Sequence, residues 1–282
     1  MESGSVHSIM ATPKRPAKPG KRWTLKELDA YNIYIKTVDT QAFFGFIDLP
    51  HPSVEPVILQ NIDVSYDLAL SLPDDHRLFF VHLHDTTDKD QPRSGVDFTY
   101  HLLNGIMQFD QPRGVTHTRT TFFFIMSGQR VSAVADLSVR RGDYQTILVQ
   151  RDRVSLPLFP CCRASLNTYQ VSRERAEPRL VASAIGAFSK DNDKRTANGL
   201  VSIASKRYIG IITIGTAHFF YKITITQVLV DAVKNSQFPA QETIVERFIP
   251  VPNVDDFLRD GMVPLDNRHA CLQCYEGLKT LL

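Results

Sequence analysis

The order of helix-like and strand-like segments between residues 93 and 226 constrains the fold of this chain more than any other feature. Residues 96–109 carry apolar side chains at a helical period, and residues 177–189 do so again, with Pro178 in the first turn. Runs of β-branched and aromatic residues predict strands at 121–126, 131–139, 144–150, 208–215 and 221–226. Because only short turns separate the first three runs, they should form an antiparallel meander. The order α-β-β-β-α-β therefore predicts an α+β fold.

The segments on either side of this core, which spans residues 93–226, suggest one domain with an appended tail. Residues 1–22 hold five basic residues, one acid and several prolines, so we expect a disordered basic leader. Residues 23–92 form an N-terminal subregion, in which 79–85 is expected to be a strand with His82 and His84 on one face. Residues 227–282 form a C-terminal cap that ends in a helix over 266–282.

Composition excludes some classes of protein. The net charge of +2 gives no whole-molecule field for attracting nucleic acid or membrane, so a charge argument must be local. No apolar run approaches the roughly 20 residues of a membrane span, and the N-terminus has no apolar signal segment. We expect a cytoplasmic or nuclear protein without a membrane partner.

The four cysteines are too sparse for a disulfide scaffold. Cys161 and Cys162 with Cys271 and Cys274 could supply four thiolates to zinc. The alternative is favoured: in a helix over 266–282 the last two thiols fall at core spacing with Tyr275, as small buried residues.

Several phrases in the chain carry a family resemblance. They lie at residues 23–33, 43–45, 182–188, 215–226 and 261–268, and they occur in the same order in a large, mostly uncharacterised fungal family. From Trp23 onward the chain resembles this branch of the PD-(D/E)XK superfamily. The resemblance implies a restriction-endonuclease-like α-β-β-β-α-β core with an N-terminal extension and a C-terminal helix.

The resemblance also implies where a nuclease site would lie. Asp136 matches the first metal-binding carboxylate, and an acid-x-Lys triplet on the next strand would complete a Mg²⁺ site. Here that segment reads Gln150, Arg151, Asp152 and Arg153, with Arg151 at the metal-binding acid and Arg153 at the lysine.

A cation at the Arg151 position opposes metal binding. Two unit positive charges ~4 Å apart repel by about 4 kcal/mol at an effective dielectric of 20, and a dication is repelled about twice as strongly. We therefore predict no metal and no cofactor, with Mg²⁺ only if an atypical nuclease survives. Asp136 is expected to pair with Arg151 or Arg153 as a buried acid.

The surroundings of the degenerate site are basic. Residues 140–195 contain 11 Lys and Arg against six Asp and Glu. Acids or amides expected at the supporting helices are replaced by Ser94, Arg179 and Ser183. Gln150, Arg179, Arg140 and Arg141 are the positions where we expect binding. The alternative is an ordinary solvated surface.

Three functions follow, in order of preference. The first is an inactive nuclease-fold protein that binds nucleic acid or another polyanion through this basic cleft. The second is a structural module that binds a protein partner. The third is a Mg²⁺-dependent nuclease that uses Asp136 with an unconventional partner.

Overall fold

The computed structural model describes residues 15–86, 94–112, 114–142, 144–151 and 166–282, and leaves out the side chains of 66, 151 and 166–173. The strands are β1 (Ile33–Thr37), β2 (Gly114–Met126), β3 (Gln129–Arg141), β4 (Tyr144–Arg151), β5 (Ser205–Ile214), β6 (Ala217–Thr226) and β7 (Thr243–Phe248). The helical segments are η1 (Gly20–Arg22), α1 (Leu25–Ala30), α2 (Thr40–Phe44), α3 (Pro56–Gln60), α4 (Tyr66–Ser71), α5 (Asp74–Asp85), α6 (Ser94–His101), the π-helical turn η2 (Leu102–Ile106), α7 (Leu166–Ala197), α8 (Gln227–Asn235), α9 (Val254–Asp260) and α10 (Leu265–Lys279).

The seven strands of the described residues form one open mixed sheet in the order β1-β7-β6-β5-β4-β3-β2. The meander β2-β3-β4 is antiparallel, as predicted. The long helix α7 lies between β4 and β5 in the chain, which pair in parallel, and β1 pairs with β7 in parallel. The mixed α+β class is therefore confirmed, with strands several residues longer than expected.

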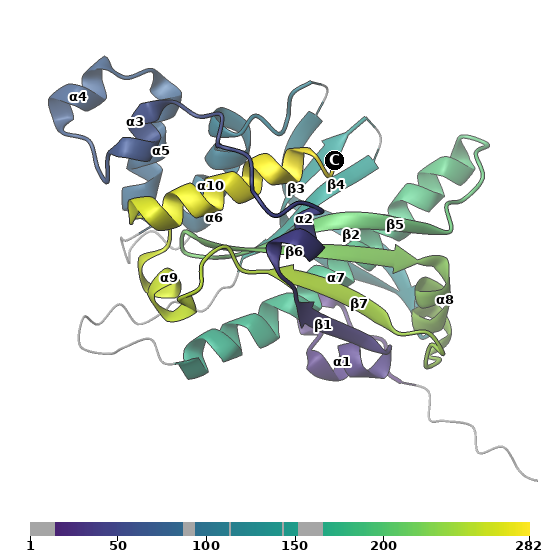
Figure 1. Cartoon of the computed structure of the whole chain (residues 1–282). Helices are drawn as coiled ribbons and strands as arrows, with labels where there is room; N and C mark the ends of the chain where they lie inside the picture. The colour runs from purple at the N-terminus through teal and green to yellow at the C-terminus, as the bar shows by residue number, and fades with distance from the viewer. Residues whose placement is uncertain (1–14, 87–93, 113, 143, 152–165) are drawn as a thin grey trace, which may run out of the picture.

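Helices cover both faces of the sheet (Figure 1). On one face, α7 contacts the strands through Glu177, which accepts a hydrogen bond from Tyr221, and through Asp191, which accepts one from Tyr208. On the other face, His218 of β6 bonds with Thr99 of α6 and with Tyr275 of α10. Figure 1 shows α10 crossing in front of the sheet and α7 running behind it. The hydrophobic core thus consists of two layers.

The strand expected at 79–85 is wrong, because this segment belongs to helix α5. Phe79, Phe80 and Leu83 are its buried residues, which is helical spacing. Pro73 precedes the helix, and two aspartates occupy its first turn, where acids favour a helix start. Side chains two positions apart on a helix point to different sides, so His82 and His84 do not share a face.

The other helices differ from expectation mainly in length. α7 is 32 residues long rather than 13, and Pro178 lies inside it instead of in the first turn. The helix predicted at 96–109 is shorter and ends in the π-helical turn η2. The C-terminal helix is confirmed as α10, in which Cys271 and Cys274 are fully buried as predicted. Cys161 and Cys162 lie outside the described residues.

The leader packs on the body earlier than its predicted boundary at residue 22. Gly20 is buried, and a Cβ there would lie 2.6 Å from the Cβ of Ala133 and 3.0 Å from that of Ala182. The Lys18 ammonium forms an ion pair with Glu27. The absence of a side chain at Gly20 lets the leader approach β3 and α7 closely, which charge and proline content did not reveal.

Candidate functional site

Asp136 and Gln150 lie side by side on neighbouring strands. Leu137 of β3 pairs with Val149 of β4. Because the two strands are antiparallel, Asp136, which precedes Leu137, lies across from Gln150, which follows Val149. The Gln150 side-chain amide donates a hydrogen bond of 2.8 Å to Oδ2 of Asp136. Both residues are buried, with 7% and 4% of their surface exposed. The prediction that these two strand segments are neighbours is therefore confirmed.

The amide of Gln150 is a partner of Asp136 that the sequence did not predict. The register gives Gln150 the position across from Asp136, whereas Arg151 pairs along its backbone with Thr213 of β5. The side chain of Arg151, and Asp152 and Arg153 altogether, lie outside the described residues. The predicted pairing of Asp136 with Arg151 or Arg153 therefore stays a prediction.

Helix α7 faces this pair. Gln150 pairs with Ile212 of β5, and alternate residues of that strand, Tyr208 and Gly210, contact α7. Arg179 and Ser183 lie one turn apart on α7, as predicted. Ser183 is 1% exposed, and its hydroxyl has no hydrogen-bond partner in the described part of the chain. Ser94 begins α6, which packs on the opposite face of the sheet.

The described residues do not fit the Mg²⁺ that an active nuclease would need. Within the described ranges, no group of three or more His, Cys, Asp or Glu side chains is placed to hold a metal ion. The pair supplies one carboxylate, and one of its oxygens already accepts a bond from the Gln150 amide. Mg²⁺ requires near-octahedral oxygen ligands and favours carboxylates, which this arrangement does not provide.

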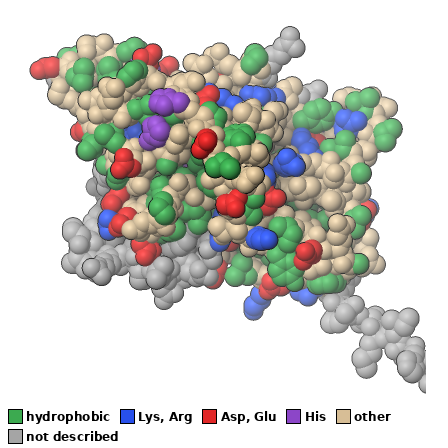
Figure 2. Space-filling model, in the orientation of Figure 1, with side chains coloured by type: hydrophobic (Ala, Val, Ile, Leu, Met, Phe, Trp, Pro, Cys, Tyr) green, Lys and Arg blue, Asp and Glu red, His purple; other side chains and the backbone are tan. Residues whose placement is uncertain are grey.

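Several basic side chains gather near the C-terminal half of α7, beyond the Asp136–Gln150 pair. We define the basic patch by Arg140 at the end of β3, Lys190, Lys194 and Arg195 on α7, and Lys206 on β5, and we include Arg141 as the next residue along β3. Figure 2 shows Lys and Arg side chains over the region where Figure 1 draws β3, β4 and β5. Partial burial lowers the pKa of Lys190, and the nearby charges of Lys194 and Arg140 lower it further. These cations are therefore close enough to repel one another.

The two arginines of β3 have unused hydrogen-bonding capacity. The Nε atoms of Arg140 and Arg141 are both buried, and neither has a hydrogen-bond partner among the residues that the structure describes. A buried donor without an acceptor costs about 1–3 kcal/mol. Such groups favour an incoming anion, because it would supply the missing acceptors.

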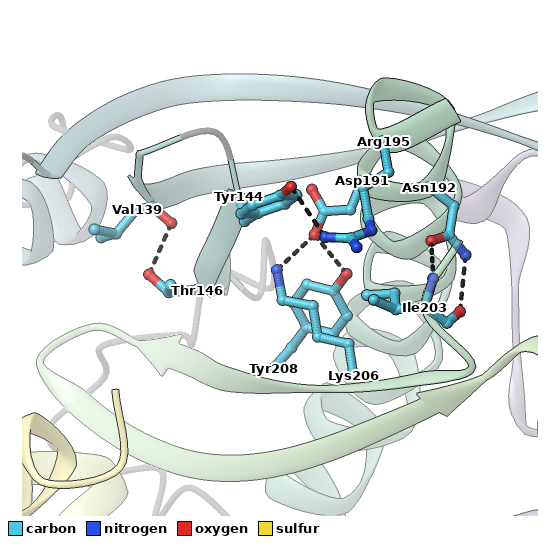
Figure 3. Close-up of polar contacts among 9 residues, drawn as sticks. All are labelled: Val139, Tyr144, Thr146, Asp191, Asn192, Arg195, Ile203, Lys206 and Tyr208. Atoms are coloured by element: carbon cyan, nitrogen blue, oxygen red, sulfur yellow. Dashed lines mark hydrogen bonds and ion pairs between the residues drawn. The ribbon is translucent and has the colours of Figure 1, made fainter. Parts of the chain in front are cut away.

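One buried acid organises the other side of the patch (Figure 3). Oδ2 of Asp191 accepts bonds from Lys206 Nζ at 2.6 Å and from the Tyr208 hydroxyl at 2.9 Å. Burial lowers the pKa of Lys206, while Asp191 opposes this shift. Figure 3 shows Lys206 and Tyr208 pointing from β5 toward α7. Asp191 therefore pairs with Lys206, and its charge also partly offsets the repulsion that Lys194 and Arg140 exert on Lys190.

Tyr144 lies between two cations of the patch. Its ring centroid is 5.1 Å from Lys206 Nζ and 6.0 Å from the Arg195 guanidinium carbon. Arg195 also donates to the Tyr144 hydroxyl at 3.3 Å and to the carbonyl of Val201 at 2.7 Å. Cation–π contacts and hydrogen bonds thus hold the side chain of Arg195 in place.

The sequence reasoning missed this Asp191 network. Lys206 and Tyr208 lie two residues apart on a strand and so share a face, and Asp191 interrupts an otherwise apolar stripe of α7. A lone acid on a helix's buried face indicates a cationic partner nearby. Asp191 thus indicated a buried ion pair, but the sequence did not indicate that β5 would supply its partner.

Comparison with known proteins identifies no relative. Neither a protein-family model nor a curated protein matches the chain. None of the described helices is long and apolar enough to cross a membrane.

Proposed function

We propose that this protein binds a polyanion, with the phosphate backbone of a nucleic acid as the best match, through the basic patch and without cutting it. The observation that carries the proposal is the pair of guanidinium groups at Arg140 and Arg141. Each keeps a buried Nε donor without an acceptor in the described residues. Phosphate oxygens are the acceptors that a planar guanidinium matches best.

The electrostatics of the patch support an anionic ligand. The pKa of Lys190 is lowered by burial and then by the charges of Lys194 and Arg140, so bringing these groups together costs free energy in the absence of a counter-charge. A bound phosphate would remove that repulsion. Among the described residues, the buried acid at the patch is Asp191, which forms an ion pair with Lys206 and partly offsets the charges around Lys190.

The order of helices and strands beneath the patch supports the proposal that this is a nuclease-like fold. The succession of α6, the meander β2-β3-β4, α7 and β5 follows the order expected of a restriction-endonuclease-like core. The carboxylate that such a core would use, Asp136, accepts a hydrogen bond from the Gln150 amide, and no group of three or more metal-ligating side chains surrounds it within the described residues. We therefore infer binding without hydrolysis.

The test is fluorescence anisotropy with labelled duplex and single-stranded oligonucleotides at several salt concentrations. We expect the double variant Arg140→Gln/Arg141→Gln to bind about tenfold more weakly. The slope of log K against log salt should fall by about two, close to one for each lost phosphate contact. The matched control is Arg77→Gln/Arg259→Gln, which removes the same charge from exposed positions on α5 and α9.

Two results would overturn the proposal. Equal losses in both double variants would show that only net charge matters, and the absence of salt-dependent binding would favour a protein-binding module. For the inactive core, we expect no plasmid nicking with Mg²⁺ or Mn²⁺. Nicking that disappears in Asp136→Asn would instead identify a working nuclease.

A further inference from the structure

Two histidines from distant parts of the chain lie together on the surface. His51 belongs to the segment before α3, and His269 lies on α10. Their ring centroids are 5.4 Å apart, and the ring planes meet at 71°. His51 is exposed and His269 is half-buried, so solvent reaches the pair.

The hydrogen bond of His51 fixes which of its nitrogens is available. Nδ1 lies 3.1 Å from the carbonyl oxygen of Pro52. A carbonyl oxygen can only accept, so Nδ1 carries the hydrogen and Nε2 carries the lone pair in the neutral ring. A backbone carbonyl that holds the far nitrogen in this way is the usual support of a metal-ligating histidine. Within the described residues, the ring nitrogens of His269 have no hydrogen-bond partner.

The separation of the two rings fits a single shared ion. A zinc–nitrogen bond is about 2.0–2.1 Å, so an imidazole centroid lies about 3.2 Å from the metal. Two imidazoles on one tetrahedral ion then have centroids about 5.2 Å apart. The observed 5.4 Å is close to this value, so the spacing of the rings is compatible with one shared ion.

The backbone that carries His51 is already positioned. His51 stands between Pro50 and Pro52, which restrict its backbone angles. The next residue, Ser53, donates from its amide and hydroxyl to the Glu276 carboxylate of α10 at 3.4 and 3.5 Å. The segment is thus attached to the helix that carries His269, so little conformational freedom would be lost on binding.

A second pair of histidines provides a contrast. The rings of His82 and His101 are also 5.4 Å apart, but His101 is buried and its Nε2 bonds to the carbonyl of Asp75 at 2.7 Å. Burial, and then the charge of His101, lower the pKa of His82. That pair is engaged in packing α5 against α6, whereas the pair of His51 and His269 is open.

We propose that His51 and His269 bind one divalent ion of the borderline transition metals, Zn²⁺, Cu²⁺ or Ni²⁺. Imidazole nitrogen suits these ions, whereas Mg²⁺ and Ca²⁺ require oxygen. No third His, Cys, Asp or Glu of the described residues completes the site, so water fills the remaining positions. The ion would join the segment before α3 to α10. This site is independent of the basic patch and of the proposed polyanion binding.

The test uses the full chain, stripped of metal with a chelator and titrated with Zn²⁺ in competition with a chromogenic indicator. We expect one site in the wild type. His51→Ala and His269→Ala should each weaken binding by about tenfold or more, since the loss of even an outer-shell partner has an effect of that size. The exposed histidine His117 of β2 is the matched control, and His117→Ala should bind like the wild type.

A spectroscopic readout identifies the ligands directly. With one equivalent of Cu²⁺, electron paramagnetic resonance of the wild type should show coupling to two imidazole nitrogens, and each single variant should show one. Circular dichroism confirms that the variants are folded. Wild-type affinity in either single variant, or a copper signal unchanged by both substitutions, would overturn the proposal.

Discussion

Arginines in two regions of the molecule illustrate opposite ways of burying a guanidinium. Arg268 of α10 has no exposed surface, and its nitrogens donate to five backbone carbonyls. These belong to Met262, Ile58, Asn61, Ile62 and Val263. Burial lowers its pKa to about 10, which still leaves it charged at neutral pH. This guanidinium joins α3 and the loop after α9 to the C-terminal helix.

Arg140 and Arg141 differ from Arg268 in the use of their donors. Both are half-buried at the end of β3, with Nε atoms that lack partners in the described structure. A guanidinium whose donors are all taken stabilises the fold but has nothing left for a ligand. A guanidinium with unused donors contributes little to stability but can bind an anion. The difference therefore separates structural arginines from binding arginines.

The largest expected effect is at Arg268. Arg268→Ala removes the donors of five backbone carbonyls, two of them in fully buried bonds, and leaves a cavity over the rings of Phe79 and Phe80. We expect the free energy of unfolding to fall by about 4 kcal/mol, measured by urea denaturation. Arg259→Ala, at an exposed arginine of α9, should change it little. If both variants unfold alike, bonds to carbonyls do not stabilise the fold as described.

The buried basic side chain of His218 differs from both kinds of arginine, because it stays neutral. Thr99 donates its hydroxyl hydrogen to Gly95, so it accepts from Nε2 of His218, and Nδ1 accepts from the hydroxyl of Tyr275. Burial lowers the pKa of His218 to about 3. The unfolded chain therefore binds a proton between about pH 6.5 and 3 that the folded chain does not, and stability falls as pH falls.

The free energy of unfolding should therefore depend measurably on pH. We expect the wild type to lose about 1.4 kcal/mol for each pH unit below 6 through this group. His218→Gln, although less stable at pH 7, should show a smaller loss between pH 6.5 and 4.5. Urea denaturation at several pH values measures both slopes. Equal slopes would show that His218 takes up its proton in the folded state.

Lys18 tests an intermediate case, a cation with one partner. Burial raises the pKa of Glu27, but the bonds from Lys18 and Thr24 outweigh it, so the pKa lies below its usual value. A lowered carboxyl pKa stabilises the fold above the unfolded value of 4.5, and this contribution disappears as pH falls. Because Lys18 is 37% exposed, we expect Lys18→Gln to cost only about 0.5–1 kcal/mol at pH 7.

Thermal melting of Lys18→Gln and the wild type at pH 7 and pH 3 checks this prediction. The difference in melting temperature should be larger at neutral pH than in acid, because protonation of Glu27 removes the ion pair. A chain that begins at Lys21 should lose more stability than the single variant, because it also loses the contact of Gly20 with Ala133 and Ala182. A difference as large in acid as at neutral pH would show that the ion pair is not its cause.

The smallest expected effect on stability is at the basic patch. Arg140→Gln/Arg141→Gln should not lower the free energy of unfolding by more than about 0.5 kcal/mol, since no hydrogen bond of either side chain is lost within the described residues. Relief of repulsion with Lys190 could even stabilise the fold. Urea denaturation beside the binding assay measures both properties. If the free energy of unfolding fell nearly as much as in Arg268→Ala, then Arg140 and Arg141 would be structural arginines like Arg268.

The elements that short stretches of sequence determine, such as the β2-β3-β4 meander, could be predicted. The meander was found because its turns contain Gly128 and Gly142, both at positive φ, between alternating runs. α5 was missed because its adjacent aromatic residues satisfy a strand pattern as well as a helical one.

The candidate site depended on information that is not local. Near the turn, Arg140 of β3 pairs with Gln145 of β4. If this register continued along both strands, Val149 would lie across from Asp136. A register shift between Val139 and Arg140 moves Gln150 there instead. A bulge of one residue thus decided which side chain met Asp136, and the sequence around it carries no distinct signal. The partners of Lys206 and Arg268 likewise came from distant segments that only the fold brings together.

The pairing of β1 with β7 has a consequence for the synthesis of this protein. Ile33 pairs with Thr243, so β1 meets its neighbouring strand only after the rest of the sheet has been translated, whereas Gly20 can already contact Ala133. At about 5–20 residues per second, β1 waits for roughly 10 seconds or more before its neighbouring strand exists. During that time Ile33 and Trp23, both buried in the folded protein, are exposed to solvent. A chain truncated before Thr243 therefore leaves β1 without its neighbouring strand.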